Sequence, residues 1–257
     1  MKISFFKAII NPFGTIGDNL KDFFKVSLIF ASVLTVVGYC LGATYACFYT
    51  EEASSFYYCS PMGYGFFLYQ IIKFFLFAVF IKNWVNLAFE KTGLDFKPQK
   101  QDLKIFALII AFSLICFLPF VSIYFLYIRV PNPDWTIELL YFSFVSIGFV
   151  IPFLSLRFLP IFGFLSLDKK LPPFKEIWNK IKGNHFKLVL FAFILILLFV
   201  FLLNSFNQSF LNIKESLNIF NVLLVDFIYN ITLLLVLAIF INHCIILTYF
   251  IEGDIEK

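Results

Sequence analysis

The chain has 257 residues, 61% of them hydrophobic and 14% charged, with a formal net charge of +4. A soluble domain is nearer half apolar and a quarter charged. A globule of this length has too little interior to hide forty Phe among so many other apolar side chains. The composition therefore excludes a water-soluble globule and predicts that lipid is the main solvent of the chain. Basic residues lie in short loops between apolar runs, which argues against nucleic-acid binding.

Long apolar runs that do not alternate with polar residues predict helices and exclude a barrel. We predict an all-α polytopic membrane protein that forms one integral membrane domain over residues 1–257. The six predicted transmembrane helices cover residues 26–48, 64–90, 104–128, 137–165, 187–204 and 222–250. Two further amphipathic segments, 172–182 and 205–220, predict helices that lie on the membrane surface.

The distribution of Lys and Arg predicts the orientation of these spans. Fifteen of the twenty basic residues fall in the N-terminal segment, the second and fourth loops and the C-terminal tail. The opposite loops contain only Arg129 and Lys214. By the positive-inside rule, both termini face the cytoplasm, and we predict a multi-pass protein of the cell inner (plasma) membrane. The first 25 residues are too long and too acidic for the basic start of a signal peptide, so the first span is predicted to be an anchor.

The segment PPFKEIWNKIKGNHFK, residues 172–187, predicts an amphipathic helix. Phe174, Ile177, Trp178 and Ile181 fall on one helical stripe, and the lysines fall off it. Gly183 suits the end of this helix. We predict that the stripe enters the headgroup region while the lysines meet anionic lipid. A substrate-binding cytoplasmic loop is the alternative interpretation.

Two charges inside the predicted spans form a possible intramembrane pair. Lys73 lies about 13 Å into the second span at about 1.5 Å per residue, and Asp226 lies one turn inside the sixth, in the same outer half of the membrane. Pairing would avoid the cost of an isolated charge in lipid. Structural stabilisation and a transport relay have the same pattern in the sequence, and a lysine can also snorkel to the membrane surface.

A second polar group is predicted at the inner leaflet. Lys82 and Glu90 lie on one face of the second span, and Arg157 lies inside the fourth, where Glu90 is its expected partner. Such a cluster either fixes the packing of the spans or binds an anionic lipid headgroup.

Small residues in the first span predict close helix packing. Gly38, Gly42 and Ala46 are spaced four apart, so another helix of the chain is expected there, with homo-oligomer formation or a protein partner as the alternative. Cys47 and Cys59 flank the first outer loop. They form a disulfide if that compartment is oxidising, and two free thiols are the equal alternative.

Residues 157–188, RFLPIFGFLSLDKKLPPFKEIWNKIKGNHFKL, resemble a segment of uncharacterised six-helix inner-membrane families of bacteria. Arg157, Pro160, Trp178, Gly183 and Asn184 match that pattern. The layout of the whole chain is similar to the YciC-like families and to the membrane domains fused to some glycerophosphodiester phosphodiesterases. The resemblance implies a bacterial envelope protein. It implies no catalytic residues, because the phosphodiesterase domain has no counterpart in this sequence.

Motifs of catalysis and cofactor binding do not occur in the sequence. It has no GxSxG, HExxH, P-loop or Rossmann glycine pattern and no clustered metal ligands, so we predict no catalytic residues, no cofactor and no metal. The sequence favours a non-enzymatic inner-membrane protein that organises lipid or partner proteins. The alternative is a small-solute or ion transporter that uses Lys73, Asp226 and Arg157.

Overall fold

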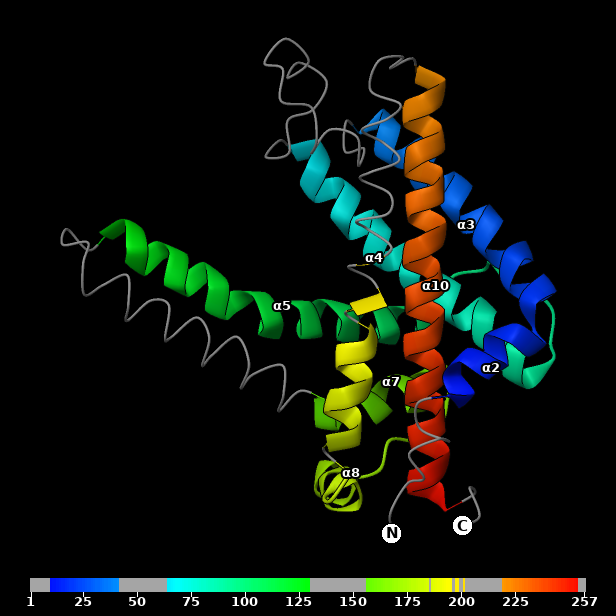
Figure 1. Cartoon of the computed structure of the whole chain (residues 1–257), viewed down its shortest axis with the longest axis vertical. Helices are drawn as coiled ribbons and strands as arrows, with labels where there is room; N and C mark the ends of the chain where they lie inside the picture. The colour runs from blue at the N-terminus through cyan, green and yellow to red at the C-terminus, as the bar shows by residue number, and fades with distance from the viewer. Residues whose placement is uncertain are drawn as a thin grey trace.

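A computed structural model shows a helical fold, and the part of the chain that it describes contains no strand (Figure 1). The structure describes residues 10–41, 64–129, 156–184, 186–195, 197–198, 201 and 219–253. The predicted all-α class is confirmed. The elements are α2 (Asn11–Asp18), α3 (Leu20–Cys40), α4 (Tyr64–Val85), the π-helical turn η3 (Asn86–Glu90), α5 (Lys100–Arg129), the 3-10 turn η4 (Leu156–Phe158), α7 (Leu159–Ser166), α8 (Phe174–Ile181) and α10 (Ile219–Glu252).

Three helical stretches are long and apolar enough to cross a membrane: Leu20–Cys40, Phe67–Glu90 and Leu223–Glu252. They overlap the first, second and sixth predicted spans, of which residues 42–48 of the first lie outside the described residues. This confirms the coarser prediction, a chain that associates with a membrane through apolar helices.

The other three predicted spans are not among these three stretches, and the structure describes the fourth and the fifth only in part. The third falls within α5, and the fifth begins with a shorter apolar helix, Phe186–Leu195. The fourth lies outside the described residues as far as residue 155 and continues through η4 and α7. The second predicted surface helix, 205–220, lies outside the described residues up to residue 218.

The α3 helix has an apolar outer side that other described helices leave uncovered. Phe24, Leu28 and Val36 are exposed, and 59% of Val36 is accessible. The opposite side, which includes Ser27 and Ala31, is fully buried against the rest of the protein. A contiguous apolar face of this kind is a liability in water and is normal in lipid, so it agrees with a helix that crosses the membrane.

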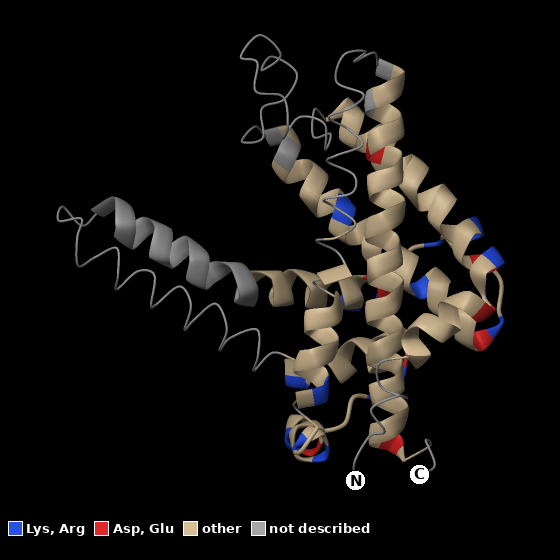
Figure 2. Cartoon of the chain, viewed as in Figure 1, with Lys and Arg blue, Asp and Glu red and all other residues tan. Residues whose placement is uncertain are grey.

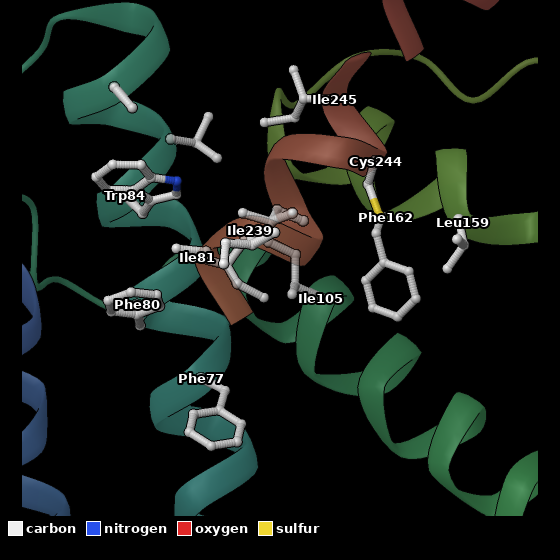
Figure 3. Packing of buried hydrophobic residues seen from close by; sticks show 14 of the residues in the cluster. Phe77, Phe80, Ile81, Trp84, Ile105, Leu159, Phe162, Ile239, Cys244 and Ile245 are labelled. Carbon is white, nitrogen blue, oxygen red and sulfur yellow. The ribbon is translucent and has the colours of Figure 1, made fainter. Parts of the chain in front are cut away.

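The α10 helix is the central element of the fold. It contacts α2, α3, α4, α7 and α8, while α5 contacts α4 and α7 and extends away from α10 at a steep angle (Figure 1). In the core, Ile81 of α4 faces Ile239 of α10, and Phe162 of α7 packs on the other side of α10 (Figure 3). Since α10 is apolar around its whole circumference, it is suited to this central place.

The contact between α7 and α10 depends on Gly163. A Cβ atom at this position would lie 2.4 Å from the carbonyl oxygen of Cys244 and 2.2 Å from Oγ1 of Thr248. Only a residue without a side chain allows the two helix backbones to approach this closely. Almost every residue of α7 is buried as a result.

Three elements meet at the side chain of Asn242 in α10. The indole nitrogen of Trp84 donates a hydrogen bond of 2.8 Å to Oδ1 of Asn242. The Asn242 amide nitrogen donates one of 2.9 Å to the carbonyl of Pro12 in α2. Asn242 and Trp84 are fully buried, so these bonds fix α2 and α4 against α10 in an environment without water.

We expect Asn242→Ala to lower the free energy of unfolding by about 1–3 kcal/mol, because it leaves a buried donor and a buried acceptor unsatisfied. Denaturant unfolding of the protein in detergent micelles measures this loss. Asn179→Ala, at an exposed position on α8, is the control and should change stability by less than about 0.5 kcal/mol. Equal losses in the two variants would contradict the role given to the Asn242 hydrogen bonds.

Candidate functional site

Aromatic and acidic side chains surround the ammonium group of Lys73. We define the Lys73 cage by Tyr69, Phe77, Asp226 and Tyr229. The Lys73 Nζ atom lies 5.7 Å from the ring centroid of Tyr69, 5.6 Å from that of Phe77 and 5.7 Å from that of Tyr229. Asp226 is 3% exposed and interacts electrostatically with both Lys73 and Tyr69. The structure thus brings the two predicted intramembrane charges together.

The aromatic members of the cage did not emerge from the sequence analysis. Tyr69 lies one turn before Lys73 on α4, and Tyr229 lies three residues after Asp226 on α10. Residues three or four apart share a helix face. This spacing is the signal that could have identified them, once α4 and α10 were known to be neighbours.

Lys82 has a different environment from the predicted one. It is 1% exposed, and its Nζ atom lies 3.1 Å from Oδ2 of Asp102, which is itself fully buried. The same ammonium group donates a hydrogen bond of 2.9 Å to the carbonyl of Lys97. The prediction that Lys82 belongs to a lipid-binding cluster at the inner leaflet is corrected, because Lys82 lies inside the protein where α4 and α5 meet. It does not face a lipid headgroup.

The connection between α4 and α5 is held by a second set of bonds beside this ion pair. The Asn83 amide donates to the carbonyl of Asp95 at 3.1 Å, and the backbone N–H of Asp95 donates to Oδ1 of Asn83 at 2.8 Å. The chain leaves η3 through Lys91, which has a positive φ of 55°. These contacts indicate that Lys82 has a structural role, the packing alternative considered for this cluster.

Arg157 lies beside α8 and not beside Glu90. Its guanidinium group stacks on the ring of Trp178 at 3.8 Å from the centroid. The neighbouring Phe158 contacts the rings of Trp178 and Phe174, each at 6.0 Å between centroids. Glu90 is exposed at the end of η3, and the ion pairs among the described residues do not join it to Arg157. The predicted cluster of Lys82, Glu90 and Arg157 is therefore divided between two places.

The predicted amphipathic helix is present as α8, but its apolar stripe has two environments. Ile177 and Ile181 are fully buried in the protein core, which corrects the expectation that they enter the headgroup region. Phe174 is 64% exposed, and Trp178 is half-buried beneath Arg157. Gly183 follows the helix with a φ of 95°, which suits a glycine after a helix end.

A groove with a volume of about 700 Å³ lies between α8 and the C-terminal end of α10. We call it the α8–α10 groove. Its lining includes the basic residues Lys175, Lys180 and Lys182, the acidic residues Glu176 and Glu252, and the buried Phe250 and Ile251.

The three lysines of the α8–α10 groove differ in their partners. Lys180 donates a hydrogen bond of 2.6 Å to the carbonyl of Ile251 and pairs with Glu176 at 2.9 Å. Lys175 and Lys182 are exposed and form no ion pair within the part of the chain that the structure describes. Two of the three groove lysines thus have no acidic partner among the described residues.

The α8–α10 groove lies at the charged end of the helix bundle. The α10 helix has 34 residues, so it is about 51 Å long at about 1.5 Å per residue and exceeds the roughly 30 Å of a hydrocarbon core. At its C-terminal end, Lys169 pairs with Glu252 and lies 4.6 Å from the ring centroid of Tyr249. Charged residues also gather around α8 and this end of α10, whereas the middle of α10 has none (Figure 2). This end is the one suited to the headgroup region.

Of the small residues predicted to form a packing face on the first span, only Gly38 is among the described residues, and it packs against another helix of the same chain. A Cβ atom on Gly38 would lie 3.3 Å from the ring of Tyr69 in α4. Gly42 and Ala46, and the cysteines Cys47 and Cys59, lie outside the described residues. The described part of the chain also contains no group of three or more His, Cys, Asp or Glu side chains placed to hold a metal ion.

Comparisons with protein-family models, with curated proteins and with solved structures find no match to this chain. The resemblance of residues 157–188 to six-helix inner-membrane families therefore stays a prediction. The described part of the chain therefore belongs to the class of all-helical proteins, with three helices able to cross a membrane.

Proposed function

We propose that this protein is a six-helix inner-membrane protein of bacteria that binds anionic lipid headgroups in the α8–α10 groove and performs no catalysis. Both termini lie in the cytoplasm in this arrangement. The observation that carries the proposal is the groove itself, where Lys175 and Lys182 have no ion-pair partner among the described residues. The helical state of α5 and of Phe186–Leu195 supports the third and fifth spans.

The chemistry of the groove suits a phosphate headgroup. Lys175 lies in the first turn of α8 and Lys182 directly follows the end of the helix, and both line the groove. A lysine near an anionic membrane surface contributes about 1 kcal/mol to lipid binding. Phe250 and Ile251 line the groove but are buried, so the binding depends on the charges of the lysines. The guanidinium group of Arg157, stacked on Trp178 of α8, is a further cation beside this helix.

We expect Lys175→Gln/Lys182→Gln to reduce the retention of anionic lipid by roughly tenfold or more, since two contributions of about 1 kcal/mol are removed. Native mass spectrometry of the protein from nanodiscs of phosphatidylglycerol and phosphatidylcholine measures this retention. Lys21→Gln/Lys25→Gln removes the same charge from two exposed positions of α3 and is the matched control. Equal losses in the two variants, or no loss in the first, would refute the groove as the site.

Transport of a small solute is the second candidate function. It is favoured by the proximity of Lys73 and Asp226 inside the predicted membrane region. Arg157, the third residue predicted for transport, does not belong to this site. It lies at α8, which contacts Ile251, and Ile251 is roughly 37 Å from Asp226 along α10 at about 1.5 Å per residue. Any transport function would use the Lys73 cage without Arg157.

A further inference from the structure

The Lys73 cage holds more recognition groups than a buried ion pair needs. One carboxylate, Asp226, is enough to neutralise Lys73, yet three aromatic rings lie within 5.7 Å of its ammonium nitrogen. Two of these rings come from α4 and the third from α10. A ring of this kind attracts a cation with its negative face, and the attraction strengthens when water is excluded.

Polar groups beside the cage extend the site toward α3. Asn230 follows Asp226 by one turn of α10 and is 2% exposed. Its amide nitrogen donates a hydrogen bond of 3.1 Å to Oγ1 of Thr35, whereas its Oδ1 atom has no hydrogen-bond partner among the described residues. A buried acceptor without a donor is unfavourable, and an N–H group of a bound molecule would satisfy it.

These groups together match the requirements of a primary ammonium group. Such a group needs a carboxylate for its charge, ring faces for its surface and oxygen atoms for its N–H bonds. Tyr69, Asp226 and Asn230 provide one example of each kind. An anion is disfavoured, since the carboxylate of Asp226 and the ring faces would repel it.

We propose that the Lys73 cage is a binding site for the primary ammonium group of a small solute, and that the ammonium group of Lys73 competes for the same place. Lys73 is only half-buried and has a flexible four-carbon chain, so it can extend away and admit another ammonium group. When it returns, the cage keeps a neutral charge in lipid. This inference goes beyond lipid binding and gives the transport alternative a substrate class.

Propylammonium is the appropriate probe, because it has the same three carbons and nitrogen as the outer part of the Lys73 side chain. We expect saturation-transfer NMR to detect its binding to the wild-type protein in detergent micelles, with no transfer to 1-propanol. Lys73→Ala removes the competing group and should strengthen the binding at least tenfold. Asp226→Asn should abolish it, and Tyr229→Leu, which keeps all charges, should weaken it severalfold.

Each outcome of this experiment decides for or against the proposal. The proposal is supported if saturation transfer to propylammonium occurs with the wild-type protein and is lost in Asp226→Asn. If Asp226→Asn does not fold, weaker transfer in Tyr229→Leu supports the proposal instead. Binding that appears only after Lys73→Ala would overturn it and leave Lys73 as a structural residue. Equal binding of 1-propanol would also overturn it, because the site would then accept any apolar molecule of that size. The lipid-retention experiment uses other residues, so either proposal can fail without the other.

Discussion

Gly163→Ala should lower the free energy of unfolding by about 3 kcal/mol, at the upper end of the range for an overpacked core. The added methyl group would lie 2.4 Å from the Cys244 carbonyl oxygen, which belongs to the backbone of α10 and cannot rotate away. The α7 and α10 helices would have to separate, and the buried contacts of α7 would weaken with them. Denaturant unfolding in detergent micelles measures the effect.

Gly17→Ala is the matched control for this substitution. Gly17 is an exposed residue of α2, and a Cβ atom there would meet nothing within 4 Å. Since alanine favours a helix over glycine by about 1 kcal/mol, this variant should be as stable as the wild type or more stable. A Gly163→Ala protein as stable as Gly17→Ala would show that α7 and α10 do not approach as closely as described.

Lys82→Met should lower the free energy of unfolding by about 3–5 kcal/mol, because it leaves the carboxylate of Asp102 buried without its cation. One oxygen of Asp102 would keep the hydrogen bond of 2.7 Å from the backbone N–H of Gln99, and the other has no partner among the described residues even in the wild type. The connection between α4 and α5 would lose its main polar contact. The same unfolding measurement applies.

Two further variants separate this effect from the loss of a lysine in general. Lys104→Met breaks an exposed ion pair with Asp168 and should cost at most about 0.5 kcal/mol. Lys82→Met/Asp102→Asn removes both charges and keeps an acceptor for Gln99, so it should be more stable than Lys82→Met alone. A double variant no more stable than Lys82→Met would show that the two charges are not coupled.

Hydropathy predicted those parts of the fold that depend only on the exclusion of water. The spans at 26–48, 64–90 and 222–250 overlap helices because a continuous apolar run has one stable arrangement in lipid. Periodicity was less informative on α8. It identified the apolar stripe, but an apolar face can meet either lipid or protein, and Ile177 and Ile181 pack against protein while Phe174 stays exposed.

The partners of the charged residues were harder to predict than their positions. Helical spacing placed Lys82 with Glu90, yet its partner Asp102 belongs to the next helix and approaches only because the chain reverses after η3. Lys73 and Asp226 could be paired from the sequence because both were predicted at a similar depth in the membrane. The length of each span gives this depth without knowledge of how the helices pack. The groove could not be anticipated, since it needs α8 to lie against the end of α10.

The central place of α10 has a consequence for the synthesis of this protein. A ribosome produces α2, α3, α4, α7 and α8 before α10, yet all of them contact α10. Asn242 reaches back 230 positions to bond Pro12, and 158 positions to Trp84. The earlier helices must therefore remain in the membrane with their inner faces uncovered until the last helix arrives. During that interval they are open to proteases and to wrong partners, so release of the chain before α10 should leave fragments that the cell degrades.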